Sequence, residues 1–262
     1  MRNKTYPSDF DLIIDMHCHM GHFRNFQIPF NDVHGMVTGM DALGIDIACV
    51  THHAGIFSDF RFGNDKVAEA MRLYPERIVG YCTINPNFPG EVRAEMERCI
   101  DGMGFKALKV HPELHDDYPL DGPNYRPVWE FAQERKLPLL SHTYSGGDSL
   151  EVFGRLADEY PDVTILLGHL AFDKGLERSF AMVNEHPNVI IDLTGPVQFH
   201  GVVERAVRGV GADRVVYGSD IPFRDAATQL GNVLYADLTR EEKTKVLGLN
   251  AKRIFGIGEM LA

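Results

Sequence analysis

The chain has 262 residues, and α/β barrels commonly reach this size as one domain. Apolar residues make up 44% and charged residues 24%, as in ordinary globular proteins. The formal net charge of −11 argues against nucleic-acid binding, which needs clustered Lys and Arg. The N-terminus lacks an apolar signal-peptide core, and no apolar run approaches the ~20 residues that span a bilayer. We therefore expect a cytoplasmic protein with no membrane partner.

Four cysteines, Cys18, Cys49, Cys82 and Cys99, stand singly, without a Cys-x-x-Cys pair. Three of them lie in or beside apolar runs, so we expect buried free thiols rather than disulfides. Cys18 differs from the others because it lies between two histidines.

Short apolar runs alternate with longer amphipathic stretches along the whole chain. The runs predict strands at 12–16, 45–50, 78–84, 105–110, 138–141, 164–167, 189–193 and 215–217. The stretches predict helices at 31–43, 64–74, 91–101, 126–135, 149–160, 176–185, 200–207 and 240–255. The strands are apolar without strict alternation, which is typical of parallel sheets buried on both faces. Eight strand–helix units over residues 1–262 predict a single (β/α)₈ TIM barrel. The other candidate, a doubly wound sheet, is disfavoured because no Gly-rich phosphate motif follows the first strand.

Active-site groups of such barrels lie at the C-terminal ends of the strands. Seven of the twelve histidines fall at predicted strand ends, whereas chance would scatter them over helices and loops. The residues at these ends are His17 and His19, His52 and His53, Lys109 and His111, His142, His169, and Asp220.

His17 and His19 are two residues apart, so on a strand their side chains point to the same side. Two neutral imidazoles there could share one zinc or other first-row divalent ion. His-x-His alone is a weak signal, because surface or core histidines produce it as often. Together with His142, His169 and Asp220 it predicts a metal site. For Asp220 the alternative is a helix N-cap for the segment that follows.

These residues resemble the amidohydrolase superfamily, specifically its amidohydrolase-related branch. That branch includes aminocarboxymuconate-semialdehyde decarboxylase, aromatic-acid decarboxylases and pyrone-dicarboxylate lactonase. The resemblance is carried by IDMHCH (14–19), GFKALKVHP (104–112), LPLLSH (137–142), LGH (167–169), YGSDIP (217–222) and NAKRIF (250–255).

The resemblance implies that His17, His19 and His142 bind a divalent metal, zinc first and manganese as the alternative. Asp220 would be a ligand, the general base, or both. His169 would orient the metal-bound water or bind a second metal. Lys109 matches the carboxylated lysine that bridges two metals in binuclear members, with a buried or ion-paired lysine as the alternative. We expect one ion, and two if Lys109 is carboxylated.

The leading functional hypothesis is hydrolysis of a small amide, lactone or ester by a metal-activated water. Asp220 would be the base, and His169 or His111 would help to stabilise the oxyanion. The alternative is metal-dependent non-oxidative decarboxylation, with Asp220 or His169 delivering a proton to carbon. A third hypothesis is a non-catalytic metal-binding barrel. The expected partner is a small-molecule substrate, with a homodimer as the expected assembly.

Several further residues are lesser candidates. They include His22, His52 and His53, of which the two after the second strand, His52 and His53, could contact a substrate carboxylate. Three arginines could pair with an acidic substrate, and the sequence does not choose among Arg61, Arg126 and Arg224. Four histidines are expected at the surface, namely His34, His115, His186 and His200.

Overall fold

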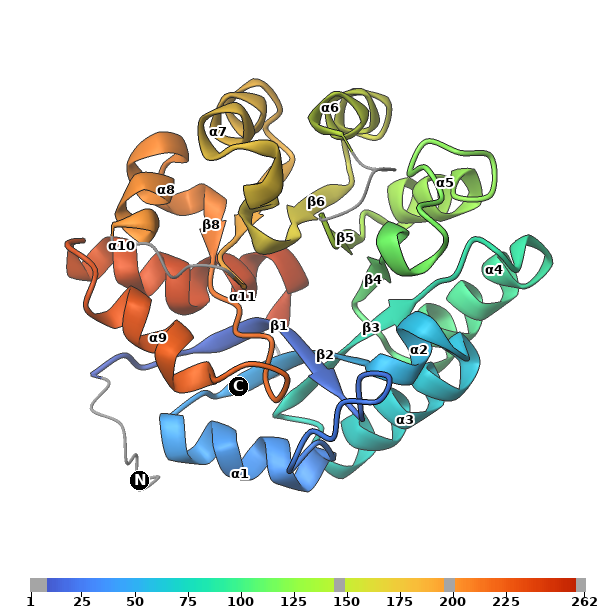
Figure 1. The fold of residues 1–262 in the computed structure, drawn as a ribbon, viewed down its shortest axis with the longest axis horizontal. Coiled ribbons are helices and arrows are strands. Elements are labelled where there is room, and N and C mark those ends of the chain that lie inside the picture. Colours follow the sequence, from blue (N-terminus) through green and yellow to red (C-terminus); the bar gives the residue numbers. More distant parts are fainter. Residues whose placement is uncertain (1–8, 144–148, 196–200, 258–262) are drawn as a thin grey trace.

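The computed structural model describes residues 9–143, 149–195 and 201–257. These residues form one eight-stranded parallel sheet in which each strand pairs with the next along the chain. The strands lie inside a ring of helices (Figure 1). They are β1 (Ile14–Met20), β2 (Ile47–His52), β3 (Ile78–Thr83), β4 (Ala107–Val110), β5 (Pro138–Ser141), β6 (Thr164–Leu167), β7 (Val189–Asp192) and β8 (Val215–Val216).

Backbone hydrogen bonds between β1 and the segment that begins at β8 close the ring. Met16 N donates to Tyr217 O at 3.0 Å, and Asp220 N donates to His17 O at 2.8 Å. The first and last units are thereby joined, and the predicted (β/α)₈ barrel is confirmed.

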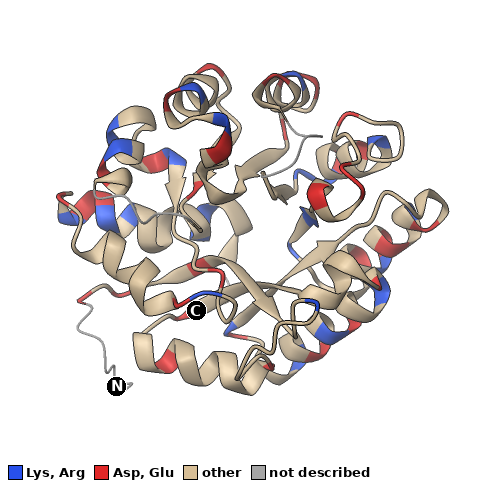
Figure 2. Ribbon diagram, in the orientation of Figure 1, with Lys and Arg blue, Asp and Glu red and all other residues tan. Residues whose placement is uncertain are grey.

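Helices cross between successive strands and cover the outside of the barrel, and many charged residues lie on them (Figure 2). They are α1 (Val33–Leu43), α2 (His53–Phe57), α3 (Phe60–Leu73), α4 (Pro89–Glu97), α5 (Arg126–Arg135), α6 (Leu150–Glu159), α7 (Leu176–Glu185), α8 (Val202–Val210), α9 (Ala226–Leu234), α10 (Arg240–Thr244) and α11 (Asn250–Phe255). Within the described residues, no helix is long and apolar enough to cross a bilayer.

The core has two parts, because the strands are buried on both faces. Outward-facing strand residues pack under the helices, whereas inward-facing ones fill the barrel. Phe255 of α11 packs edge-on against Tyr81 of β3, with ring centroids 5.6 Å apart. This contact brings the closing helix onto the interior cluster, so the barrel is a packed core rather than a pore. All four cysteines are buried and free, as predicted.

The structure corrects several predicted boundaries. β1 runs to Met20 rather than ending at residue 16, and β2 runs to His52. The histidines suggested loops, but polar side chains are compatible with a strand where they enter a polar barrel mouth. The short helix α2 and the helix α9 were not predicted, since neither has a long apolar period. The predicted helix 240–255 is interrupted by a π-helical turn, η5 (Lys245–Leu249).

Candidate metal centre and substrate pocket

The inward-facing side of the strands changes from apolar to polar towards their C-terminal ends. On β4, Ala107 belongs to the apolar interior and Lys109, two residues later, begins the polar mouth. On β7, Ile190 is followed in the same way by Asp192. Both polar side chains are buried, at 0% and 1% exposure. The period of two that builds the core therefore also aims these charged groups into the barrel.

A β-bulge in β1 positions the first histidine. The pairing with β2 shifts by one residue between Asp15 and Cys18. As a result Met16 stays in the apolar interior while the next residue, His17, also reaches the barrel mouth. Bulges commonly re-aim side chains beside active sites. Cys18 faces the outer layer instead.

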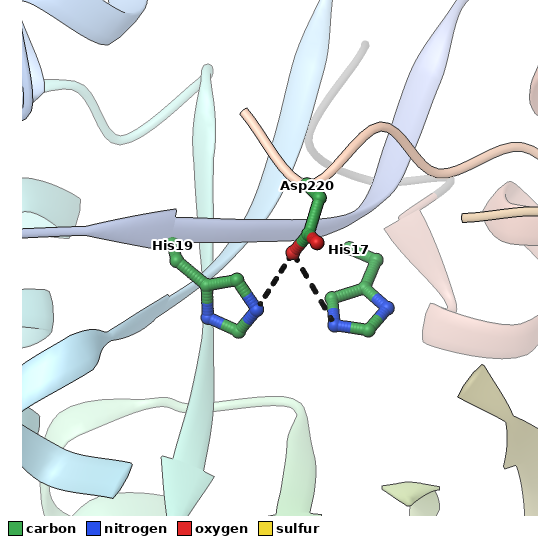
Figure 3. A group of neighbouring side chains, drawn as sticks. All are labelled: His17, His19 and Asp220. Atoms are coloured by element: carbon green, nitrogen blue, oxygen red, sulfur yellow. Dashed lines mark ion pairs between the residues drawn. The ribbon is translucent and has the colours of Figure 1, made fainter. Parts of the chain in front are cut away.

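His17, His19 and Asp220 converge at the mouth (Figure 3). Asp220 Oδ1 lies 3.1 Å from His19 Nε2 and 4.0 Å from His17 Nε2. Ligand atoms that share one ion at bond lengths near 2.1 Å lie roughly 3–4 Å apart. The two imidazoles and the carboxylate therefore fit a divalent metal.

Hydrogen bonds behind these ligands orient the rings. His17 Nδ1 lies 2.7 Å from Asp192 Oδ2, so this nitrogen donates its proton to the carboxylate. The lone pair of His17 then lies on Nε2, which faces Asp220. Asp192 is itself held by Thr194, whose hydroxyl donates to Asp192 Oδ1 at 2.7 Å. A carboxylate behind a histidine is the usual arrangement behind metal-bound imidazole. His19 Nδ1 is hydrogen-bonded to Thr51.

His142 and His169 form a second group of rings beside the first. His169 Nε2 lies 2.9 Å from His142 Nδ1, and the His169 ring centroid is 5.0 Å from that of His17. His142 Nε2 faces Glu113 Oε2 at 2.9 Å, and His111 stacks on His142 at 3.8 Å. His111, Glu113 and His142 also lie close enough to hold a metal. Because the two stacked rings are nearly parallel, however, an ion could not lie in the planes of both.

Lys109 lies within hydrogen-bonding distance of the metal-facing nitrogen of His17. Lys109 Nζ is 3.1 Å from His17 Nε2. Burial lowers the pKa of Lys109 to about 8, although Asp220 and Asp192 oppose this shift. An ammonium here would compete with a metal for the same lone pair.

Burial also keeps the histidines neutral. It lowers the pKa of His142 and of His169 to about 3, and that of His17 well below its ordinary value. Burial alone would raise the pKa of Asp220, but the hydrogen bond from His19 and nearby histidines hold it well below its usual range. Neutral imidazoles around an ionised carboxylate are the ligand forms that a divalent metal requires.

Asp220 occupies an unusual backbone position. Its φ of +69° lies in the left-handed region, where residues other than glycine are uncommon. Its side chain contacts His19, whereas the cap of α9 is Asp225, so Asp220 is not the N-cap of that helix. Gly218 precedes it in a crowded place, where a Cβ would come within 2.5 Å of Asp192 Oδ1.

A cavity of about 260 Å³ lies above this cluster. His19, His169 and Asp220 are among the residues that line it. Aromatic and aliphatic side chains and two arginines complete the lining, namely Phe23, Arg24, His53, Ile56, Leu114, Phe223 and Arg224, together with His111, Glu113 and His142. A larger cavity of about 470 Å³, lined by Ile78 and Lys106 among others, has no histidine or carboxylate in its described lining.

The structure shows which of the lesser candidate residues reach the cavity. His53 lines the cavity, whereas His52 caps α2 through its Nδ1. Among the arginines, Arg224 reaches the cavity, while Arg61 pairs with Glu91 on the outer helices.

The predicted surface position of His115 is wrong. His115 is 1% exposed because its two ring nitrogens bind Tyr125 Oη and Ile56 O. His186 is half-buried against Asp158, and His34 is exposed as predicted. His200 lies outside the described residues.

The sequence reasoning missed Asp192, Glu113 and Arg24. Asp192 ends β7 and could have been found by the strand-end rule that identified the histidines. Glu113 and Arg24 are in connections whose path only the structure shows.

A closed parallel barrel with histidines and carboxylates gathered at the strand ends defines a metal-dependent barrel enzyme. The family model described as amidohydrolase matches residues 14–257, and the chain belongs to that family.

Several relatives of the chain are decarboxylases. The gamma-resorcylate decarboxylase of Rhizobium sp. is 23% identical over 88% of this chain and 86% of its own. Two solved structures with bound manganese share the fold. Dihydroxybenzoic acid decarboxylase from Polaromonas sp., with the inhibitor 2-nitroresorcinol, has a TM-score of 0.78 at 19% identity over 95% of this chain and 99% of that one. 5-Carboxyvanillate decarboxylase from Novosphingobium aromaticivorans has a TM-score of 0.77 at 18% identity over 98% and 99%. These relatives favour the decarboxylase alternative over the hydrolase expected first, and a divalent metal without singling out zinc.

Proposed function

We propose that this protein is a metal-dependent, non-oxidative decarboxylase of a small aromatic acid. The observation that carries the proposal is the mouth cavity, which joins a metal-binding set to an aromatic wall. His19, His169 and Asp220 line it together with Phe23 and Phe223, whose rings lie 5.3 Å apart. A volume of about 260 Å³ is at the low end for ligand pockets and suits a single substituted ring. Relatives of the chain that are decarboxylases support the same chemistry.

The chain's own residues suffice for the proton transfers of this reaction. A divalent ion held by His17, His19 and Asp220, manganese or zinc, would supply positive charge beside the substrate carboxylate. Asp220 accepts the proton of a substrate hydroxyl and returns it to the ring carbon that carries the carboxylate. The C–C bond then breaks, its electron pair returns to the ring, and CO₂ leaves. His169 is the second candidate for carrying this proton, since it lies beside His17.

The test is product analysis on manganese-loaded and zinc-loaded protein. We expect CO₂ and the decarboxylated ring from 2,6-dihydroxybenzoate or 5-carboxyvanillate. In D₂O one deuterium should enter the ring at the vacated carbon. Asp213→Asn, at an exposed carboxylate, is the matched control for Asp220→Asn. Hydrolysis of lactones or esters without CO₂ release would contradict the proposal.

The position of Lys109 favours a second candidate function, hydrolysis by a binuclear centre. A neutral Lys109 amine can form an N–C bond to CO₂ and release one proton, which gives a carbamate. Lys109 Nζ and His17 Nε2 lie 3.1 Å apart. In the carbamate the nitrogen of Lys109 is no longer an ammonium, so it would not compete with a metal for the lone pair of His17 Nε2. Such a carboxylated lysine could bridge two ions.

Metal content per chain separates the two candidates. We would compare wild type with Lys109→Ala and His142→Ala. About two ions in wild type and one in Lys109→Ala would support the binuclear hydrolase. About one ion, kept in Lys109→Ala, would support the mononuclear decarboxylase and leave His142→Ala to show whether His142 is a ligand.

A further inference from the structure

A row of aromatic rings leads from the metal-binding set to the rim of the mouth cavity. His53 stacks on His19, with ring centroids 4.8 Å apart. Phe23 lies against His53 at 5.2 Å, and Phe223 lies against Phe23 at 5.3 Å. Phe26 contacts both phenylalanine rings, each at 6.2 Å. Packed aromatic pairs have centroid separations of about 4.5–7 Å, so these five rings form one continuous surface, the aromatic row.

Exposure to solvent rises along the aromatic row from the metal-binding set outwards. His53 is 3% exposed and Phe23 is half-buried, whereas Phe223 is 39% and Phe26 57% exposed. Single exposed apolar side chains are ordinary, but exposed apolar groups that adjoin one another are a common feature of binding surfaces. Phe223 and Phe26 adjoin one another, and Phe223 also lines the cavity that contains Asp220. The exposed end of the row is therefore continuous with the candidate active site.

A tight turn in the connection between β1 and α1 fixes Phe26 beside the cavity. Phe26 N donates to Phe23 O at 2.9 Å, and the two residues form an isolated antiparallel bridge. Arg24, inside the turn, has a φ of +53°. Phe23 belongs to the described lining of the cavity, and Phe26 lies beyond that lining. The turn thus extends the aromatic wall of the cavity past its rim.

We propose that the outer end of the aromatic row binds an apolar substituent of the substrate, an alkyl chain or a second ring, with Phe26 as the residue that selects it. The cavity of about 260 Å³ holds the reacting ring, with its carboxylate at the metal-binding set. The substituent leaves the cavity and lies against Phe223 and Phe26. It removes these rings from water, which a charged substituent could not do without losing its own hydration. The inference rests on the proposed function for the reaction, but the preference for an apolar substituent is a binding property that can be measured separately.

The experiment measures binding of benzoate, 3-butylbenzoate and 4-butylbenzoate to manganese-loaded protein by calorimetry. We expect at least one butylbenzoate to bind wild type ten-fold or more tightly than benzoate, at one site per chain, because burial of methylene groups is favourable. Phe26→Ala should reduce that preference at least three-fold and leave the affinity for benzoate unchanged, whereas Phe26→Leu should keep most of it.

Phe88→Ala is the matched control. Phe88 is 45% exposed, and its recorded ring contact is with Phe60 rather than with the aromatic row. This variant should keep the wild-type preference. Metal content is measured for each variant, and sedimentation of wild type and Phe26→Ala shows whether a second copy of the chain covers Phe26 instead.

Three results would overturn the inference. The first is a wild type that binds both butylbenzoates no better than benzoate. The second is a Phe26→Ala variant that weakens benzoate and butylbenzoates equally, because Phe26 would then act on the whole cavity. The third is a dimeric wild type and a monomeric Phe26→Ala with the same preference, because a second copy would then cover Phe26.

The failure of this inference and the failure of the proposed function can be told apart. A butylbenzoate preference that Phe26→Ala reduces, without CO₂ release from any aromatic acid, would contradict the proposed function alone. CO₂ release from 2,6-dihydroxybenzoate, with equal affinities for benzoate and both butylbenzoates, would contradict this inference alone.

Discussion

Two buried polar clusters of this barrel differ in how completely their atoms are paired. The first, the Glu95 cluster, consists of Glu95, Asn64 and Arg98 between α3, α4 and β3. Glu95 is 0% exposed, and its two oxygens accept from Arg98 Nη2 and Nε, each at 2.8 Å. Asn64 donates to Glu95 at 2.8 Å and accepts from the Thr83 backbone at 2.9 Å. The Glu95 cluster therefore joins two helices to a strand with every charged atom paired.

The second, the mouth cluster of His17, His19 and Asp220 with its neighbours, is incompletely paired. The Nε of Arg224 and the Nδ1 of His111 have no hydrogen-bond partner in the described residues. Native proteins pair nearly all buried polar atoms, and a ligand is one explanation for an exception. The comparison teaches that the Glu95 cluster pairs its charges within the fold, whereas the mouth cluster leaves polar atoms of its cavity lining without a partner.

The largest expected effect comes from removing the carboxylate of the mouth cluster. If the proposed function is right, Asp220→Asn should lower decarboxylation by at least about 10³-fold and reduce metal content, because Asp220 is both a ligand and the proton carrier in the proposed mechanism. Metal analysis and product assays measure this. Unfolding in urea should change little. Full activity with metal retained would mean that Asp220 has neither role.

Breaking the Glu95 cluster should instead lower stability. Glu95→Ala removes one partner of a buried ion pair, which costs about 3–5 kcal/mol for two buried groups. Arg98 is 33% exposed, so solvent screens its remaining charge and we expect about 2–3 kcal/mol. Urea unfolding gives the value, with Glu97→Ala on the exposed side of α4 as control. The affinity for metal should be unchanged. A weaker affinity for metal in Glu95→Ala would show that the two clusters are energetically coupled.

An intermediate effect is expected at Asp192, which supports the mouth cluster from behind. Asp192→Asn removes the carboxylate that fixes the His17 tautomer, and metal affinity should fall about 10–100-fold. Titration calorimetry with Mn²⁺ measures it, with Asp173→Asn as a control. A variant that binds Mn²⁺ as tightly as wild type would show that the hydrogen bond of 2.7 Å is dispensable.

The last effect, outside both clusters, appears only as a pH dependence and comes from His115. Burial lowers the pKa of His115 to about 4, from 6.5 when the chain is unfolded. Between these values the unfolded chain binds a proton that the folded chain does not, so stability falls as pH decreases. His115→Gln should remove about 1.4 kcal/mol per pH unit from the slope of stability against pH between about 6.5 and 4. Urea unfolding of wild type and His115→Gln at several pH values tests this.

The sequence predicted the barrel and the histidines at its mouth because both depend on local periodicity. Apolar runs of three to seven residues mark strands buried on both faces, and the ranges 126–135, 138–141, 164–167 and 176–185 coincide with α5, β5, β6 and α7. His17 and His19 point to one side because the strand has a period of two, and this also held in the structure.

Tertiary structure alone decided how these side chains meet. The bulge that brings His17 inward depends on the register between β1 and β2, which sequence periodicity does not contain. The burial of His115 depends on the carbonyl of Ile56, 59 residues away. Arg224 was indistinguishable from Arg61 and Arg126 in sequence, and its contact with the cavity arises from the path of the loop after β8. Local patterns fix which face a residue occupies, whereas the partners on that face come from distant parts of the chain.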